Sequence, residues 1–149
     1  RTCDKKKFEE YGLNSKLSQC SISFNKKKGT LRGMHYQGTP YNEVKLIRCT
    51  KGKTFDVIID LRPKSTTFKE WFGLELGEEN HKMLYVPEGF AHGFQTLTDN
   101  TEIFYQISEY YMRDYSMGVR WNDPAFNIKW ALVPTVISKK DQSYPDFEG

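Results

Sequence analysis

Only three histidines occur in this sequence, and their surroundings separate two candidates for chemistry from one surface residue. His35 lies in LRGMHYQ and His92 lies in PEGFAHGF, two segments in which glycine accompanies residues typical of β-strands. His81 lies in GEENHKM, which predicts a surface turn without a functional role. Because imidazole gains and loses a proton near neutral pH, His35 and His92 are candidates for acid–base catalysis or for metal binding.

Metal binding is the less favoured of these two interpretations. A catalytic metal takes about three protein ligands, and His35, His92 and a carboxylate could supply them. However, the sequence contains no H-x-H pair, and its cysteines do not have the spacing of metal ligands: Cys3, Cys20 and Cys49. We therefore predict a site without a metal ion.

Arg32 raises a question about the strand that carries His35. The two residues are three positions apart, so in a regular strand their side chains point to opposite faces. Both side chains could line one cavity if the strand bulges or kinks at the intervening Gly33. We therefore predict an irregularity between Leu31 and Gln37.

Length, charge and cysteine usage limit the class of protein. The chain has 149 residues, which suits a single domain over residues 1–149. The net charge of +3 is compatible with binding of an anionic small molecule and does not by itself indicate nucleic-acid binding. The one basic cluster, Lys26 to Lys28, predicts a solvated turn. An odd number of cysteines favours a reducing compartment, and no apolar run approaches the ~18 residues of a membrane span. We therefore expect a cytoplasmic protein without nucleic-acid or membrane partners.

Short strands separated by turns dominate the hydropathy pattern. Asp4 is a candidate cap for a short helix over residues 5–11. Apolar or alternating runs predict strands over 43–52, 54–62, 83–87 and 101–111. Turn residues recur between these runs, which is typical of an antiparallel sandwich or barrel. The aromatic, turn-rich segment after Trp121 is expected to wrap around the barrel with little regular structure.

The run TFDVIIDLR predicts a strand with two different faces. One face carries apolar side chains only: Phe55, Val57, Ile59 and Leu61. The other face combines charge with one apolar residue: Asp56, Ile58, Asp60 and Arg62.

Several segments carry a resemblance to known proteins. PEGFAHGF fits the pattern P-x-G-x-x-H and resembles the second motif of the cupin superfamily. In chain order, five segments together resemble the dTDP-4-dehydrorhamnose 3,5-epimerase family: LRGMHYQ, KLIRCTKGKTFDVIIDLR, WFGLELGEENHKMLYVPEGFAHGFQTL, EIFYQISEYY and VRWNDPAFNIKW. The resemblance implies an all-β protein, an antiparallel cupin-type β-barrel or jelly roll with a few short helices. It also implies a substrate that is a nucleotide-diphosphate 4-keto sugar.

The resemblance further implies a set of site residues. It assigns the catalytic base to His35, its partner carboxylate to Asp141 in SKKD, and the proton-returning acid to Tyr105 in IFYQ. It assigns contacts with the substrate to Arg32, Lys45, His92, Gln19 and Tyr111. Without the resemblance, the sequence is equally consistent with Tyr105 as a core aromatic residue. Asp141 would then be interpreted as an ordinary carboxylate of the tail.

The chemistry of a 4-keto sugar suits these residue types. The keto group acidifies the hydrogens on the neighbouring carbons, C3 and C5. Inversion of such a carbon needs a base on one face, an acid on the other and donors that stabilise the enolate. Histidine with an orienting carboxylate, tyrosine, and arginine or lysine can fill these roles. The reaction requires no metal, flavin or nicotinamide, so we expect no cofactor.

Some features depart from the family or leave alternatives open. Many relatives carry a run resembling Gln-Asp-Asn-His-Ser where this chain reads QCSIS from Gln19 to Ser23, so Ser21 replaces an asparagine. The resemblance implies a homodimer and an N-terminal strand that would precede Arg1. The nucleotide, and inversion at C3, C5 or both, stay open. So do two other functions: a non-catalytic cupin that binds a sugar nucleotide, and a ketoisomerase or dehydratase on the same scaffold.

Overall fold

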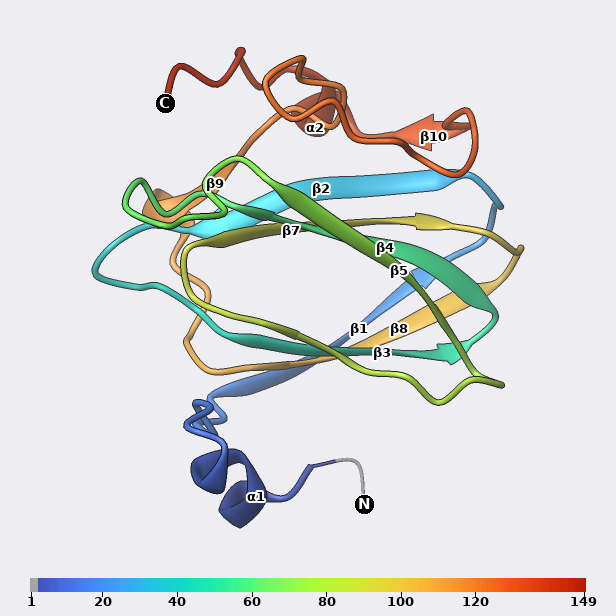
Figure 1. The fold of residues 1–149 in the computed structure, drawn as a ribbon. Coiled ribbons are helices and arrows are strands. Elements are labelled where there is room, and N and C mark those ends of the chain that lie inside the picture. The colour runs from blue at the N-terminus through green and yellow to red at the C-terminus, as the bar shows by residue number, and fades with distance from the viewer. Residues whose placement is uncertain (1–2) are drawn as a thin grey trace.

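Two β-sheets face each other in the computed structural model, which describes residues 3–149 (Figure 1). Residues 1 and 2 of the predicted domain lie outside the described residues. The lower sheet in Figure 1 has the strand order β1-β8-β3-β6, with the bounds Gln19–Asn25, Thr101–Ile107, Lys45–Lys51 and Leu84–Val86. All its strand pairs are antiparallel.

The upper sheet has the strand order β10-β2-β7-β4-β5, and β9 pairs with β2 beside this path. The bounds of these strands are Val136–Ile137, Thr30–Gln37, Phe90–Thr96, Lys53–Asp60, Trp71–Gly77 and, for β9, Ser116–Gly118. Only the short β10 runs parallel to its neighbour. The predicted antiparallel jelly roll is confirmed, and the strand runs predicted from the sequence coincide with β3, β4, β6 and β8.

The end of β8 differs from the prediction, which extended that strand to residue 111. The strand ends at Ile107. The Ser108 hydroxyl accepts a hydrogen bond from the Val44 N–H at 2.8 Å, and the Glu109 carboxylate accepts one from the Tyr110 N–H at 2.9 Å. The Ser108 N–H still donates to the Val44 carbonyl at 3.0 Å, but the N–H groups of Tyr110 and Tyr111 donate to the side chains of Glu109 and Gln19, and the chain leaves the sheet.

Strand β4 is buried on both faces, and this separates the core into two parts. Ile58 belongs to the cluster between the sheets, which also contains Ile47, Leu76, Phe94 and Ile103. Val57 and Ile59 belong to the cluster on the outer face of the upper sheet, with Met34, Ala91 and Phe126. The predicted two-faced pattern of this strand is therefore confirmed, and each face packs against a different layer.

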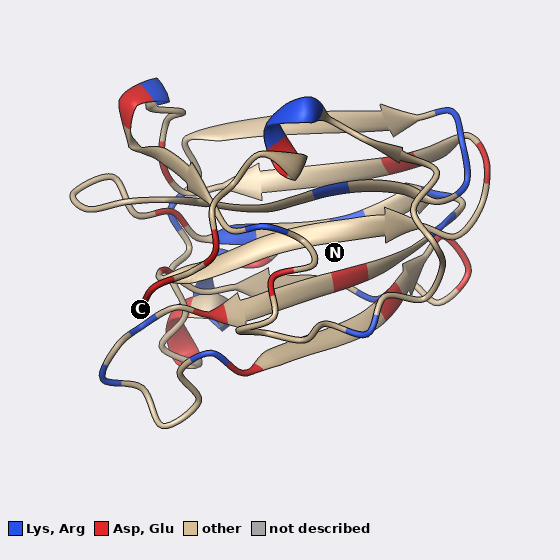
Figure 2. Ribbon diagram, turned by 90° about the horizontal axis from the view of Figure 1, so that it is seen from above, with Lys and Arg blue, Asp and Glu red and all other residues tan. Residues whose placement is uncertain are grey.

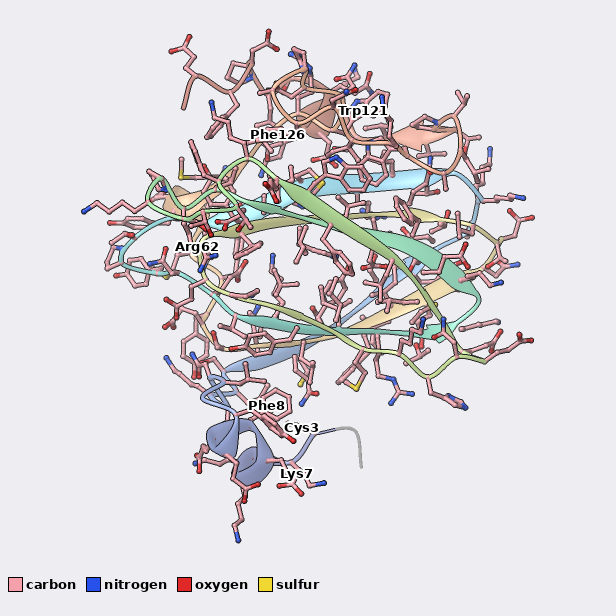
Figure 3. The ribbon with its side chains drawn as sticks, in the orientation of Figure 1. Cys3, Lys7, Phe8, Arg62, Trp121 and Phe126 are labelled. Carbon is pink, nitrogen blue, oxygen red and sulfur yellow. The ribbon has the colours of Figure 1, made fainter. Side chains whose placement is uncertain are left out.

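The tail after Trp121 covers the outer face of the upper sheet, as predicted. Figure 3 shows Trp121 and Phe126 above that sheet. The Trp130 ring meets Phe55 edge-on at 6.4 Å, and the Trp130 Nε1–H donates to the Trp121 carbonyl at 2.8 Å. Apart from β10 and the short helix α2 (Lys139–Gln142), this tail has no regular structure.

The predicted N-terminal helix is present as α1, Lys5–Glu10. The Asp4 carboxylate caps it by accepting a hydrogen bond from the Lys7 N–H at 3.3 Å. Figure 3 shows Phe8 extending from the helix towards the lower sheet, where its ring lies 6.0 Å from that of Tyr85. The helix therefore packs below the lower sheet, on the other side from the tail (Figure 1).

The strand that carries Arg32 and His35 is irregular, as predicted. The pairing of β2 with β7 shifts register between these two residues. Gly33 lies at φ +120°, and a Cβ atom there would come within 2.6 Å of the Gly93 α-carbon. Glycine is required at this position both by the backbone conformation and by the close approach of β7.

Charged residues of both signs are interspersed along the ribbon (Figure 2). The cluster Lys26 to Lys28 is exposed in the turn between β1 and β2, as predicted. Among residues 3–149, no helix is long and apolar enough to cross a membrane.

Candidate active site

A cavity of about 420 Å³ opens between the two sheets. Its walls come from β1, β2, β3, β7 and β8 and from α2 in the tail. All eight site residues predicted from the sequence line it: Gln19, Arg32, His35, Lys45, His92, Tyr105, Tyr111 and Asp141. The structure therefore brings together residues that are up to 122 positions apart, from 19 to 141 in the chain.

His35 and Asp141 form the most direct pair in this cavity. The Asp141 Oδ1 atom lies 2.7 Å from His35 Nε2. The other carboxylate oxygen, Oδ2, accepts a hydrogen bond from the Gly33 N–H. The backbone of Asp141 is fixed as well, because its N–H donates to the Ser138 hydroxyl. The bulge at Gly33 thus gives the carboxylate a backbone donor beside the histidine that it orients.

The environment keeps Asp141 ionised. Burial raises the pKa of this carboxyl group. This increase is outweighed by the hydrogen bond and charge of His35 and by the hydrogen bonds with Gly33 and Ser138, all of which lower the pKa. The net pKa therefore lies below its ordinary value. An ionised carboxylate only accepts hydrogen bonds, so in neutral His35 the proton lies on Nε2. Nδ1 of His35 is therefore the unprotonated nitrogen. The His35 side chain is 40% exposed, whereas the Asp141 side chain is 4% exposed.

Tyr105 lies on β8, on the inward face predicted for it. Burial raises the pKa of its hydroxyl well above the ordinary value, the charge of Asp56 raises it further, and Arg32 lowers it only in part. The phenol therefore remains protonated at neutral pH. It can give up its proton only to a strong base, and an enolate is such a base.

His92 forms a second pair, with Asp56 of β4. The Asp56 Oδ1 atom lies 2.8 Å from His92 Nε2, and the Thr54 hydroxyl donates to the other carboxylate oxygen. Burial lowers the pKa of His92, and the hydrogen bond and charge of Asp56 offset this effect only partly. The His92 ring centroid lies 6.2 Å from that of Tyr105, so a neutral imidazole borders the tyrosine.

The cationic residues of the cavity are held by partners from neighbouring segments. The Arg32 Nε–H donates to the Asn25 Oδ1 atom at 2.8 Å. Lys45 Nζ lies 2.9 Å from Glu43 Oε1, and both side chains are largely buried. These contacts orient positive charge in the cavity, where a diphosphate or a developing oxyanion can bind.

Gln19 and Tyr111 lie together at the mouth of the cavity. The Gln19 Oε1 atom accepts a hydrogen bond from the Tyr111 N–H at 3.4 Å, and the Tyr111 side chain is largely exposed. An exposed ring at the entrance of a pocket that can bind anions is suited to stacking on a flat ligand. Ser21 also lines the cavity and lies directly opposite Tyr105 in the β1–β8 pair.

Several contributors were not identified from the sequence: Asn25, Glu43, Asp56 and Lys140. A signal existed for Asp56, because it is a carboxylate on the inward face of a strand that is otherwise largely apolar. Glu43 also shares a face with Lys45, two positions later. No local pattern identifies Asn25. Among residues 3–149, no three His, Cys, Asp or Glu side chains are grouped in a way that could hold a metal ion.

The buried His92 predicts a pH-dependent stability. Because its pKa lies below the ordinary 6.5, the unfolded chain binds a proton that the folded protein does not, and the free energy of unfolding falls as the pH falls below about 6.5. The contribution is at most about 1.4 kcal/mol for each pH unit. His92→Gln retains an amide donor for Asp56 without a titrating group, so we expect a shallower pH dependence in urea unfolding.

His81→Gln is the matched control, because His81 is exposed and lies outside the cavity. It should keep the wild-type slope between about pH 6.5 and 5.5. Equal slopes in wild type and His92→Gln would contradict the assignment of this pH dependence to His92.

The fold and the cavity define a class: a cupin-type β-barrel whose interior holds histidine, carboxylate and tyrosine side chains that can accept or donate a proton, without a cluster of metal ligands among residues 3–149. Comparison with known proteins identifies the family. The family model described as dTDP-4-dehydrorhamnose 3,5-epimerase matches residues 1–149. The chain belongs to this family of isomerases.

Named relatives agree with this assignment. The chain is 44% identical over 130 residues to a dTDP-4-dehydrorhamnose 3,5-epimerase of Sinorhizobium fredii, covering 87% of this chain and 67% of the relative. It is 45% identical over 114 residues to the enzyme of the same name from Shigella flexneri, covering 76% of this chain and 63% of the relative. The matched segment thus spans about two thirds of the length of these relatives.

Solved structures are similar over almost the whole chain. The dTDP-4-dehydrorhamnose 3,5-epimerase of Bacillus anthracis, with TDP and PPi bound, has a TM-score of 0.95 at 41% identity and covers 99% of this chain and 84% of its own. The epimerase of Legionella pneumophila in complex with dTDP-4-keto-L-rhamnose has a TM-score of 0.89 at 34% identity, with 95% and 75% covered. The fold of this chain is therefore that of the epimerases.

Proposed function

We propose that this chain is a cofactor-independent epimerase that inverts C3 and C5 of a dTDP-linked 4-keto-6-deoxy sugar. One observation carries the proposal: the His35–Asp141 pair and the buried Tyr105 open into the same cavity. The names of the relatives support it, as does the dTDP-4-keto-L-rhamnose bound to the Legionella pneumophila structure.

In the proposed mechanism, His35 is the base. Its Nδ1 takes the proton from C3 or C5, and the electron pair of the C–H bond moves towards the 4-keto oxygen to form an enolate. The imidazolium that results is stabilised by the Asp141 carboxylate at 2.7 Å. The Arg32 and Lys45 side chains are the candidates for stabilising the enolate oxygen or the diphosphate.

Tyr105 is the proposed acid. It delivers its hydroxyl proton to the carbon from the face opposite His35, the enolate collapses back to the ketone, and the configuration is inverted. The raised pKa of Tyr105 supports this role, because the residue keeps its proton until a strong base forms next to it. The neutral His92 beside it, with Asp56, belongs to the wall of the proposed sugar pocket.

The nucleotide end of the substrate is assigned to the cavity mouth. Tyr111 offers a surface on which the base can stack, and Gln19 offers an amide next to it. The asparagine of many relatives is Ser21 here, a shorter side chain at a position that lines the cavity. We propose that this replacement changes contacts with the nucleotide or the sugar while leaving the proton-transfer groups in place.

The comparisons favour an epimerase over a binding module, a ketoisomerase or a dehydratase, because the named relatives carry the epimerase name. One similar structure, from Streptomyces bikiniensis at 26% identity, is named a 3'-monoepimerase. The test of the function must therefore read the two carbons separately.

The decisive experiment incubates the protein with dTDP-linked 4-keto-6-deoxyglucose in D2O and follows C3 and C5 by NMR. We expect deuterium to enter at both carbons together with inversion. The GDP- and CDP-linked sugars serve as comparisons and should react more slowly. Absence of exchange at both carbons with all three substrates would refute the enzymatic function.

We further propose that residues 1–149 belong to one domain that acts as a cytoplasmic homodimer. The exposed apolar side chains of β1 support an interface between two copies: Ile22 is 62% exposed and Phe24 is 48% exposed. Such a strip on the outer face of a sheet is more typical of an interface than of a surface that stays in water.

A further inference from the structure

A tyrosine outside the proposed reaction occupies space next to His35. His35 of β2 and Gly118 of β9 are directly opposed in an antiparallel pair, so a side chain at 118 would stand beside the imidazole on the same face. A Cβ atom on Gly118 would lie 2.4 Å from Cζ of Tyr144 and 2.6 Å from its hydroxyl oxygen. The phenol of Tyr144 thus fills the place that glycine leaves open.

The same ring contacts the histidine. The ring centroids of His35 and Tyr144 lie 6.4 Å apart at an interplanar angle of 66°, an edge-on contact. Asp141 fixes His35 through one hydrogen bond to Nε2, and a single bond still allows the ring to swing about that contact. A second contact from a rigid aromatic ring restricts this motion.

We propose that Tyr144 is a positioning residue that holds the His35 imidazole in its reactive orientation, in a space created by Gly118. The proposal rests on the proposed role of His35 as the base. Asp141 and Tyr144 are three positions apart, so one short segment supplies both supports of the histidine.

The segment around Tyr144 is itself anchored. The Arg120 guanidinium donates to the Tyr144 carbonyl at 3.3 Å, pairs with the Asp146 carboxylate and donates to Asn122 Oδ1 at 2.8 Å. The Tyr144 hydroxyl oxygen is buried, and the polar side chain that acts on it is that of Lys140; no hydrogen bond joins it to His35 in the described part of the chain. The aromatic ring, and not the hydroxyl, is therefore the part that acts on His35.

Three single variants test this assignment. Tyr144→Ala removes the ring, and Gly118→Ala forces it away from its place. Both should lower kcat by roughly 10- to 100-fold, the effect of a misplaced catalytic group, with KM nearly unchanged. Tyr144→Phe retains the ring and should keep the wild-type kcat. Tyr11→Ala, on the exposed C-terminal end of α1, is the matched control for loss of a tyrosine.

The double variant tests whether the two positions act through one space. In the Tyr144→Ala background the added methyl group at 118 meets no phenol, so Gly118→Ala should have little further effect on kcat. If the two losses instead multiply, the proposed sharing of space is wrong. Tyr144→Leu replaces the alanine variant if circular dichroism shows that the latter does not fold.

A readout without substrate separates this inference from the function. In long-range 1H–15N NMR spectra of the apo protein, neutral His35 should give one set of ring signals with Nε2 protonated. Tyr144→Ala and Gly118→Ala should broaden or double these signals, and Tyr144→Phe should not. Unchanged signals and kcat in both alanine variants would overturn the proposal. If wild type lacks activity but the spectra change as expected, the positioning contact stands and the function fails.

Discussion

Replacing His35 with alanine is expected to abolish both deuterium exchange and inversion at C3 and C5. No other base in the cavity has the same combination of features. Nδ1 of His35 is unprotonated in the neutral ring, the side chain is exposed to the cavity, and Asp141 stabilises the protonated ring. His92 is fully buried and already paired with Asp56, so it is a poor substitute. The loss should appear in kcat, measured by NMR in D2O.

Asp141→Asn tests the second member of the pair. The amide cannot stabilise an imidazolium by charge, and its NH2 group can favour the wrong tautomer of His35. We expect exchange and inversion to fall together by roughly 10²–10⁴-fold. His81→Ala is the control. His81 lies outside the cavity, so this variant should leave both rates unchanged.

The His35→Ala prediction has a clear contradicting outcome. Exchange at the wild-type rate in His35→Ala would show that another group removes the proton.

Tyr105→Phe is expected to separate exchange from inversion. The variant keeps the ring and its packing against the core between the sheets and removes only the hydroxyl. His35 can still remove a substrate proton and return a deuteron from the same face, so exchange should continue. Inversion should fall by roughly 10²–10⁴-fold, the usual contribution of a positioned acid.

Two other outcomes of this variant carry information. If exchange and inversion fall together, the hydroxyl also supports formation of the enolate, for example by a hydrogen bond to its oxygen. If inversion continues at the normal rate, Tyr105 is a core aromatic and the acid must be another group, with His92 or a water molecule the next candidates. Tyr85→Phe, on the other side of the lower sheet beside α1, is a matched control for loss of a tyrosine hydroxyl.

The alternation of apolar and charged residues along β4 and the frequent turns were sufficient to predict an antiparallel sandwich or barrel. Both the faces of a strand and the residues of a turn are local properties of the sequence. The end of β8 was not predictable from the same pattern. It depends on Ser108 bonding to Val44, a residue 64 positions away. Local alternation continues past this point in the sequence, but the N–H groups of Tyr110 and Tyr111 bond to side chains and not to a neighbouring strand.

The irregularity in β2 was predictable from the spacing of Arg32 and His35 together with the expectation that both line one cavity, since they could do so only if the strand was interrupted. The reason for the glycine between them was not. Gly33 is needed because its φ is +120° and because a Cβ atom there would come within 2.6 Å of the Gly93 α-carbon on β7. The contact with β7 joins segments that are distant in the chain.

The sequence by itself determined the fold class, the positions of several strands and, through the resemblance, eight of the residues that line the cavity. The tertiary structure decided which of them are paired and how each is charged. Asp56 with His92, Asn25 with Arg32, and Tyr144 with Gly118 are contacts across strands or between a strand and the tail. Burial and neighbouring charge, which set the pKa values of Tyr105, His92 and Asp141, arise only when the sheets close over the cavity, because both depend on distances in space and not along the chain.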